Sequence, residues 1–374
     1  MRPDLPVAIA GAIERCRRPS LVFDVARIDG TLAAIAEAAR AAGITALFAA
    51  KSFPHPAVRA LAAARLAGFD VASPTEVAEV AGLAAPGPGA AGKTLSVADP
   101  SGAAAGAAAS WPGRLVVGCE TVAQVRAAPP RAAVAIRLSA SLTGRDPAVG
   151  AVLEGSGRRR SRFGLDVAPA HMRASIAELA RAAGSRPVGL HVHHGPVAAT
   201  SSERVLATAR AALDAAAEAG VEPRFLNLGG AWHAIADLAA ALCAIRAALP
   251  AALELLIEPG RLVADGAGFA CGRVAVARAL DDRALCVVDL SRICHLRWSQ
   301  PELVAPPPPT GEGRDTLFVG PTCYEEDVLG EWTVAPSRFT DGARAIWRNV
   351  TGYALGWNTG FGGVPPAELV MVDA

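Results

Sequence analysis

Five residues, far apart in the sequence, carry groups that could act on a single ligand. Lys51 offers an amine, Glu258 a carboxylate and Arg261 a planar guanidinium, and the pair Gly229-Gly230 leaves backbone N–H groups uncovered by side chains. Uncovered N–H groups and a guanidinium bind phosphate, whereas a carboxylate can keep a heterocyclic nitrogen protonated. An amine forms a Schiff base with an aldehyde. Pyridoxal 5′-phosphate combines a phosphate, a ring nitrogen and an aldehyde, so we expect it as the cofactor.

These residues occupy equivalent positions in the predicted fold, because each lies shortly after an apolar run that is as long as a strand. Such apolar runs are typical of strands buried on both faces of a parallel sheet, whose ligands bind beyond the carboxyl ends of the strands. Taken singly, an exposed loop lysine, a Gly-Gly turn and a helix start at Glu-Pro-Gly-Arg are ordinary explanations, but together they favour one site. The runs are 46–50 before Lys51, 224–228 before Gly229, 253–257 before Glu258, and 189–193, which ends in His193.

The strand-like runs belong to a longer rhythm that predicts the fold. Most are separated by alanine-rich helical stretches, and such alternation over residues 25–265 predicts a (β/α)8 barrel that binds the cofactor. A doubly wound open sheet is the competing architecture, although no G-x-G-x-x-G follows the first strand, which weakens its dinucleotide-binding form. The eight runs are Ala46–Ala50, Gly68–Ala72, Thr94–Ala98, Arg114–Cys119, Ala133–Leu138, Gly189–His193, Arg224–Leu228 and Leu253–Ile257, with helices such as Pro56–Ala67, Ser202–Ala219 and Ala234–Ala248.

From residue 266 the pattern changes to short β-rich runs, which predict a C-terminal β-domain over 266–374. A strand at Ser20–Asp24 and a helix at Ala26–Ala42 precede the barrel, and we expect the N-terminal segment 1–24 to pack near the β-domain. Proline cannot join a sheet ladder, so the run Pro306–Pro309 is expected to be a stiff surface connection. The predicted β runs are Ala270–Leu280, Ala284–Asp289, Leu317–Gly320 and Ala367–Val372.

Composition excludes several other classes of protein. The 374 residues are 52% hydrophobic with a net charge of +1, and the one arginine run, Arg158–Arg160, is local, so we expect no nucleic-acid partner. Seven cysteines without C-x-x-C spacing indicate neither a disulfide framework nor a metal site and favour a reducing cytoplasm. The N-terminus lacks the layout of a signal peptide, and every apolar run is interrupted before membrane-spanning length, so no membrane association is expected.

An ordered set of motifs along almost the whole chain carries a resemblance to a known family. The motifs are Ala50-Lys51-Ser52, Gly68-Phe69-Asp70-Val71-Ala72-Ser73 followed by Glu76, Ser161-Arg162-Phe163-Gly164, His191-Val192-His193, Asn227-Leu228-Gly229-Gly230, Glu258-Pro259-Gly260-Arg261, Gly320-Pro321-Thr322-Cys323 with Asp327, and Gly352-Tyr353. The chain thereby resembles the alanine racemase-like (fold type III) pyridoxal-phosphate decarboxylases, the group of the diaminopimelate, ornithine and carboxynorspermidine decarboxylases. The carboxynorspermidine branch is the most similar, given Val288-Asp289, Cys294-His295 and the segment from Asp327 to Trp332.

The resemblance implies a role for individual residues. Lys51 would form the Schiff base, His193 would stack on the cofactor ring and Glu258 would bind the ring nitrogen. Cys323 would return a proton to the substrate carbon from the other chain's β-domain, in a homodimer with shared sites. The resemblance also assigns phosphate contacts to Gly229, Gly230, Arg261 and Tyr353, a place in the cofactor site to Gly260, and supporting positions in that site to Asp70 and Arg137.

Two departures from the family pattern bear on the ligands. Pro196 stands where many relatives have a serine that helps to bind phosphate, and Tyr324 stands where ornithine and diaminopimelate decarboxylases have an acidic residue. With Arg297 nearby in the sequence, we expect the far end of the substrate to be acidic, or bulky and polar, and to be contacted by Arg297, Tyr324 and Asp327.

Glu258 also favours one reaction over another. A carboxylate at the ring nitrogen makes the ring a strong electron sink and favours α-decarboxylation, whereas the racemases of this fold have a basic residue there. Racemisation is one alternative, and a catalytically silent, cofactor-binding homologue is another; loss of Lys51 or Cys323 would mark the latter, and both are present. Lysine, ornithine, diaminopimelate, carboxynorspermidine and an intermediate of specialised metabolism all stay open as substrates.

Overall fold

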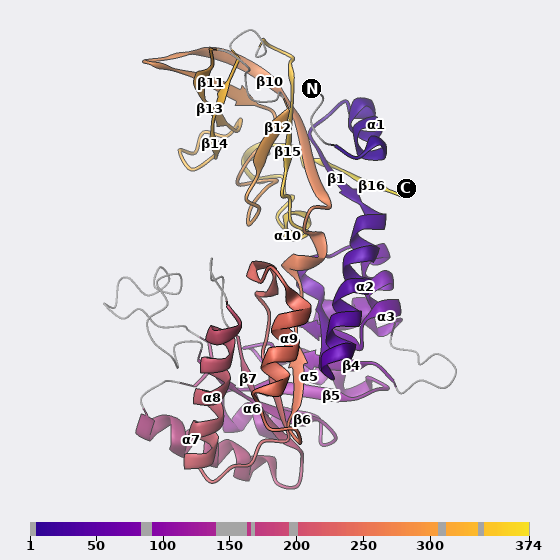
Figure 1. Cartoon of the computed structure of the whole chain (residues 1–374), viewed down its shortest axis with the longest axis vertical. Coiled ribbons are helices and arrows are strands. Elements are labelled where there is room, and N and C mark those ends of the chain that lie inside the picture. The colour runs from indigo at the N-terminus through magenta and orange to yellow at the C-terminus, as the bar shows by residue number, and fades with distance from the viewer. Residues whose placement is uncertain are drawn as a thin grey trace. The chain divides into compact units, whose positions relative to one another are not determined.

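The computed structural model describes residues 5–83, 92–139, 163–165, 169–193, 201–305, 312–335 and 340–373 (Figure 1). The arginine run 158–160, Ser161, Arg162, Pro196 and the proline run 306–309 lie outside these ranges. The chain divides into two compact units. The first contains Met1–Thr31, Ser52–Val58 and Val263–Ala374, and the second contains Leu32–Lys51 and Arg59–Leu262.

The second unit is a closed barrel of eight parallel strands, which confirms the predicted fold class. Every neighbouring pair is parallel, and the pairing of the first strand with the last closes the barrel. The eight predicted runs agree with the observed strands to within one residue at each end. The strands are β2 (Thr45–Ala49), β3 (Gly68–Val71), β4 (Thr94–Val97), β5 (Leu115–Cys119), β6 (Ala133–Leu138), β7 (Val188–Val192), β8 (Phe225–Asn227) and β9 (Glu254–Ile257).

Helices alternate with these strands, and several begin at side chains that accept backbone N–H groups. Ser73, Ser201 and Asp237 each cap a helix in this way, and Thr121 forms a capping box with Gln124. These four caps define where the helices that follow them begin. The helices are α2 (Val25–Ala42), α3 (Pro56–Arg65), α4 (Pro74–Ala81), α5 (Ala103–Ala107), α6 (Val122–Ala127), α7 (Pro169–Ala183), α8 (Ser202–Glu218) and α9 (Leu238–Ala247).

Apolar side chains from five strands meet inside the barrel. Leu47, Val116, Phe225 and Leu256 belong to one buried cluster together with two small alanines of β6. Gly189 makes room for the largest member, because a Cβ atom on Gly189 would lie 2.5 Å from the ring of Phe225. The interior is therefore a packed core, as in other barrels of this kind, and leaves the carboxyl ends of the strands for the site.

The first unit contains a β-sheet domain built around one long strand, β10 (Gly268–Leu280). The first part of β10 pairs with β1 (Ser20–Asp24) and β15 (Arg344–Arg348), and its second part pairs with β11 (Arg283–Val288). The strand order β12-β15-β10-β11-β13-β14 is completed by β1, which pairs in parallel with β16. The remaining strands are β12 (Glu302–Ala305), β13 (Arg314–Val319), β14 (Val328–Val334) and β16 (Glu368–Val372).

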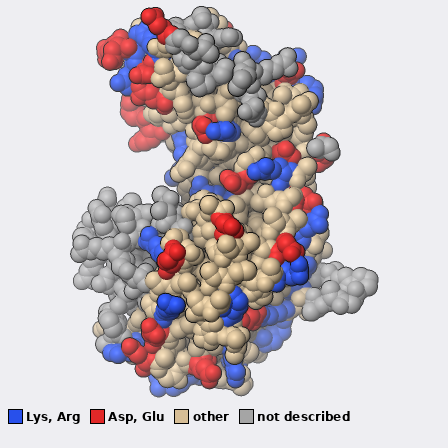
Figure 2. All heavy atoms as spheres, viewed as in Figure 1, with Lys and Arg blue, Asp and Glu red and all other residues tan. Residues whose placement is uncertain are grey.

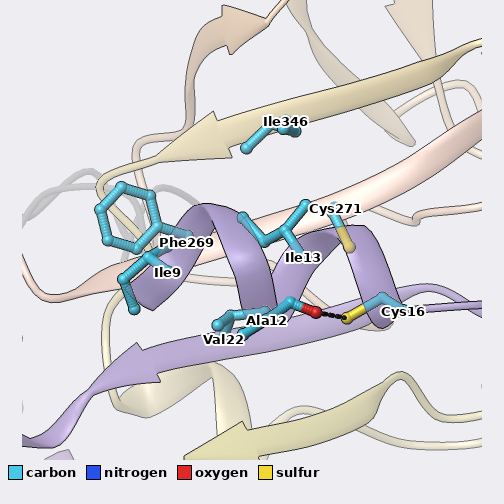
Figure 3. Close-up of a cluster of buried hydrophobic side chains, with 8 residues drawn as sticks. All are labelled: Ile9, Ala12, Ile13, Cys16, Val22, Phe269, Cys271 and Ile346. Carbon is cyan, nitrogen blue, oxygen red and sulfur yellow. Dashed lines mark hydrogen bonds between the residues drawn. The ribbon is translucent and has the colours of Figure 1, made fainter. Parts of the chain in front are cut away.

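A short helix, α1 (Val7–Arg15), covers part of this sheet and was not predicted (Figure 3). Its residues Ile9, Ala12 and Ile13 pack in one buried cluster with strand residues that include Phe269 and Ile346. The guanidinium of Arg344 donates to the Ile13 carbonyl at 2.6 Å near the carboxyl end of α1, where a cation is favourable. The N-terminal residues are thus integrated into the β-domain through both α1 and β1.

Two surface properties bear on the expectations from composition. Basic and acidic side chains are mixed on the face drawn in Figure 2. Among the residues that the structure describes, no helix is long and apolar enough to cross a membrane.

Candidate active site

Lys51 lies just beyond β2, in the single 3-10 turn Ala50–Ser52, and its amine contacts Asp70. The Nζ atom donates to Oδ2 of Asp70 at 2.8 Å. Asp70 belongs to β3, the neighbour of β2, and pairs with Ala49, so the parallel register places the two side chains at the same edge of the barrel. Burial, reinforced by the charge of Glu258, raises the pKa of Asp70 from 3.8 to about 6, although Lys51 opposes the shift.

Glu258 follows β9 and has a buried carboxylate held by two donors. Its Oε1 atom accepts from Nδ2 of Asn227 at 2.6 Å and from Oγ of Ser96 at 3.3 Å. The backbone N–H of Glu258 also donates to the carbonyl of Gly229 at 2.8 Å. Both the main chain and the side chain of Glu258 are therefore fixed by neighbouring strands.

A buried histidine beside Glu258 was missed as a separate site residue. His191 was predicted only as part of a motif, yet its Nε2 lies 3.7 Å from Oε1 of Glu258. Burial, and next the positive charge of Arg137, lower the pKa of His191 from 6.5 to about 3, so the imidazole is neutral at physiological pH. A period-two strand pattern would have placed His191 inside the barrel, since it alternates with the apolar residues Leu190 and Val192.

The loop after β8 brings bare backbone close to His193. Gly229 has a φ of +66°, and a Cβ atom added there would lie 2.7 Å from the carbonyl oxygen of Val192. A Cβ atom on Gly230 would lie 3.2 Å from Nε2 of His193. Because both residues are glycine, the backbone of the loop can lie close to the His193 imidazole.

The N–H of Gly229 was expected to bind phosphate, but it already has a partner. It donates to Oδ1 of Asn227 at 2.9 Å, and the indole of Trp232 donates to the Gly229 carbonyl at 2.7 Å. Within the part of the chain that the structure describes, the Gly230 N–H donates no hydrogen bond. Of the two predicted phosphate donors in this loop, the Gly229 N–H is thus already bonded to Asn227.

The two arginines predicted for the site lie on or directly after different strands of the barrel, β6 and β9. Arg137, near the carboxyl end of β6, lies 3.8 Å from Glu120, and its guanidinium carbon lies 4.6 Å from the centroid of the Phe163 ring. Arg261 begins the 3-10 helix Arg261–Ala264 directly after Gly260 and β9. Both arginines thus start from the edge of the barrel at which Lys51 and Glu258 lie.

In the β-domain, Asp327 has a different environment from the one expected. Its carboxylate is buried and accepts from Oγ of Ser291 at 2.9 Å, from Oγ1 of Thr322 at 2.7 Å and from the backbone N–H of Arg292 at 2.6 Å. These bonds tie together two loops of the sheet. They favour a structural role for Asp327 over the substrate contact that the sequence analysis assigns to it.

Cys323 and Tyr324 lie on the loop that Asp327 organises, and both side chains are exposed. The Tyr324 ring, 50% exposed, lies 5.2 Å from the ring of Phe361. Exposure keeps the Cys323 thiol and the Tyr324 phenol accessible to a ligand or to another chain.

Arg297 and Tyr353 belong to one aromatic cluster of the β-domain, made of Arg297, Trp298, Tyr353 and Trp357. The guanidinium carbon of Arg297 lies 4.4 Å from the centroid of the Trp357 ring, a cation–π distance. Trp298 has a φ of +65° and lies 5.2 Å from Tyr353 and 5.5 Å from Trp357. A non-glycine residue held at positive φ is strained, and such strain gathers at functional positions.

The structure thus brings the predicted residues together as two sets. The barrel unit holds Lys51, Asp70, Arg137, His193, Glu258 and the glycine loop, whereas Cys323, Tyr324, Asp327, Arg297 and Tyr353 belong to the other unit. Within the described ranges, no group of three or more His, Cys, Asp or Glu side chains is arranged to hold a metal ion.

The barrel residues fit pyridoxal phosphate. Oδ1 of Asp70 and Nε2 of His191 are buried polar atoms without a hydrogen-bond partner in the described part of the chain, which is typical of a site that receives a polar ligand. An amine at Lys51, a fixed carboxylate at Glu258 and uncovered backbone at Gly230 supply the three groups that such a cofactor needs.

Comparison with known proteins agrees with this chemistry. Residues 26–265 match the family described as pyridoxal-dependent decarboxylase, pyridoxal binding domain, and the chain belongs to this family. Its members are carboxy-lyases that use pyridoxal phosphate, so the expected cofactor, enzyme class and family are confirmed. The sequence matches none of the curated proteins with which it was compared.

Solved structures show the same fold across both units. The lysine/ornithine decarboxylase of Vibrio vulnificus, solved with putrescine, has 19% identity and a TM-score of 0.74, covering 98% of this chain and 97% of that one. The Paramecium bursaria Chlorella virus arginine decarboxylase has 15% identity and a TM-score of 0.77, covering 97% and 98%. The lysine decarboxylase of Selenomonas ruminantium has 18% identity and a TM-score of 0.72, covering 99% and 97%.

Proposed function

We propose that the chain removes the α-carboxylate of an amino acid, or of a metabolite derived from one, with Lys51, His193 and Glu258 as the catalytic residues of the barrel. The observation that carries this proposal is the buried Glu258 carboxylate, held by Asn227 and Ser96. When bound, pyridoxal phosphate supplies an aldehyde for the substrate amine and a ring that withdraws electrons from the α-carbon. A carboxylate at the ring nitrogen favours its protonated form, which is the form decarboxylation needs.

Asp70 has a defined task beside Lys51. The Lys51 amine must give up a proton before it can form a covalent bond with the aldehyde, and Oδ2 of Asp70 already accepts a hydrogen bond from it. Although burial raises the pKa of Asp70 to about 6, the carboxylate is mostly ionised at neutral pH and can accept that proton. His193 would lie along the face of the ring, against the Gly229-Gly230 loop.

Cys323 is the proposed acid that returns a proton to the substrate carbon, from the β-domain of a second chain in a homodimer. The support is its exposed thiol on a loop organised by Asp327. A reducing compartment protects an exposed thiol from oxidation, and we propose the cytoplasm as the location of the enzyme.

The substrate's far end is proposed to be acidic, or bulky and polar. The exposed Arg297 lies over Trp357, and the exposed Tyr324 offers a phenol, so the β-domain presents a cation with hydrogen-bonding aromatic groups. A guanidinium pairs with a carboxylate through two hydrogen bonds, whereas it repels an ammonium group. Two exposed glutamates, Glu325 and Glu326, make a terminal amine the competing choice, since similar folds were solved with putrescine and cadaverine.

A screen of CO2 release tests the reaction and the substrate together. Amino acids that end in an amine, a carboxylate or a bulky polar group would be compared, with Lys51→Ala as the inactive control. We expect CO2 from a carboxylate-ended or bulky substrate, and a lower kcat/KM for it in Arg297→Ala. Efficient turnover of L-ornithine or L-lysine, with a kcat/KM that is unchanged in Arg297→Ala, would contradict the substrate proposal. Racemisation without CO2 release would overturn the reaction itself.

A further inference from the structure

We propose that Asn227 is a positioning residue that couples the two halves of the cofactor site, the ring-nitrogen partner Glu258 and the glycine loop. This inference rests on the proposed function. One carboxamide makes both contacts: Nδ2 donates to Oε1 of Glu258 at 2.6 Å, and Oδ1 accepts from the N–H of Gly229 at 2.9 Å. Asn227 is the last residue of β8, is completely buried, and was predicted only as part of a motif.

The chemistry of the partners determines how the Asn227 amide is oriented. A backbone N–H can only donate, so Gly229 requires the oxygen of the side chain. The NH2 group is then left for the carboxylate, which can only accept while it is ionised. Neither aspartate, which lacks the donor, nor alanine, which lacks both atoms, can satisfy Gly229 and Glu258 together.

The two contacts are mechanically linked because the strands on both sides of Asn227 hold its backbone. Asn227 pairs with His191 of β7 and with Leu256 of β9. The Gly229 peptide is held in addition by the Glu258 N–H and the Trp232 indole, both of which donate to its carbonyl. A displacement of the Glu258 carboxylate therefore moves the Asn227 carboxamide. This in turn moves the Gly229 N–H and changes the position of the Gly230 N–H.

Ser96 offers a matched control, because it contacts only one half. Its hydroxyl donates to the same Oε1 atom of Glu258 at 3.3 Å and, among the described residues, makes no hydrogen bond to the glycine loop. Ser96→Ala should disturb the ring-nitrogen half alone, whereas Asn227→Ala should disturb both halves. A buried hydrogen bond to a charged group is worth roughly tenfold in binding or more.

The experiment measures how tightly the apoprotein binds three probes by equilibrium dialysis. The probes are pyridoxal phosphate, its analogue with carbon in place of the ring nitrogen, and pyridoxal, which lacks the phosphate. Each preference is a ratio of two affinities measured for the same protein. The preference for pyridoxal phosphate over the carbon analogue reports on the ring-nitrogen half of the site, and the preference over pyridoxal reports on the glycine loop. Asn227→Ala should reduce both preferences by about tenfold, while Ser96→Ala should reduce only the preference over the carbon analogue.

Asn227→Asp separates the two contacts within one side chain. It keeps an acceptor for Gly229, so it should retain the preference over pyridoxal. It lacks the donor to Glu258 only while both carboxylates are ionised, so its preference over the carbon analogue should fall as the pH is raised, whereas that of the wild type should not follow the same pH dependence. Circular dichroism and thermal melting would establish that each variant is folded, and Glu258→Gln would serve as the reference for the ring-nitrogen half.

The possible results separate this inference from the proposed function. If Asn227→Ala reduces only one preference, or neither, while Glu258→Gln reduces the preference over the carbon analogue, the coupling is refuted and the role of Glu258 stands. If Glu258→Gln leaves that preference unchanged, Glu258 is not the partner of the ring nitrogen and the proposed function itself is wrong.

Discussion

Lys51 and Asp70 form an ion pair of 2.8 Å in which one partner is fully buried and the other is partly exposed. They lie 19 residues apart in the chain, on adjacent parallel strands that end at the same edge of the barrel. The buried carboxylate therefore holds the amine at the place where the strands deliver their ligands.

Lys51 should carry the cofactor. Borohydride reduction of the holoenzyme followed by peptide mass mapping should find the pyridoxyl group on Lys51, and Lys51→Ala should lose the visible absorption band of the bound cofactor. Lys93 is the natural comparison, because its amine already donates to the Leu66 carbonyl at 2.8 Å. An adduct on Lys93 would show that the site has been assigned to the wrong residues.

The stability of the apoprotein should depend on pH through Asp70. Its pKa is raised from 3.8 to about 6, so the folded state binds a proton that the unfolded state releases between these values. The stability due to protonated Asp70 is present below pH 3.8 and is lost as the pH rises through 6, a change of about 3 kcal/mol.

Asp70→Asn cannot titrate, so its stability relative to the wild type should improve as the pH rises from 4 to 7. Urea unfolding of both apoproteins at several pH values measures this difference. Two parallel curves over that range would contradict the raised pKa of Asp70.

Gly229→Ala should be much more harmful than an alanine at another glycine of the same backbone conformation. Gly43 has a φ of +64° and open space around it, whereas an alanine methyl on Gly229 would lie 2.7 Å from the Val192 carbonyl oxygen. Gly43→Ala should cost about 1 kcal/mol, the price of a positive φ alone.

Gly229→Ala should cost more than that and should also weaken cofactor binding, because the loop must move away from His193. Thermal melting of the two apoproteins and their affinities for pyridoxal phosphate test the pair. Equal losses of stability, with unchanged affinity in both, would mean that the close approach has no function.

Shared active sites predict complementation between two inactive variants. When Lys51→Ala and Cys323→Ala chains are mixed and exchange at random, half of the dimers carry one chain of each kind, and one of their two sites is intact. About one quarter of all sites should then be intact, so about one quarter of the wild-type activity should return. Proven heterodimers without activity would argue that each chain uses its own Cys323.

Local patterns determined much of the barrel. Each strand is a short apolar run bounded by glycine, proline or an alanine-rich helix, so the strand positions could be predicted from neighbouring residues alone. The β-domain was harder: β12 and β15 were missed because each is a run of three apolar residues beside a charged one, too short to indicate a strand, and β14 was missed because Gly330, Glu331 and Thr333 interrupt its apolar residues. Helix α1 was missed although Ile9, Ala12 and Ile13 have helical spacing, because a segment of nine residues gives a weak periodic signal.

The same division holds within the site. The sequence alone predicted that Lys51, His193, Glu258 and the glycine pair lie just beyond barrel strands, because each follows an apolar run, and the structure has them there. Only the tertiary structure decided that Asn227 bridges Glu258 and Gly229, that His191 is buried and neutral, and that Asp327 is used to hold two loops. These roles depend on partners brought close by barrel closure and loop packing, and burial of a polar group is a property of the whole fold and not of its neighbours in the chain.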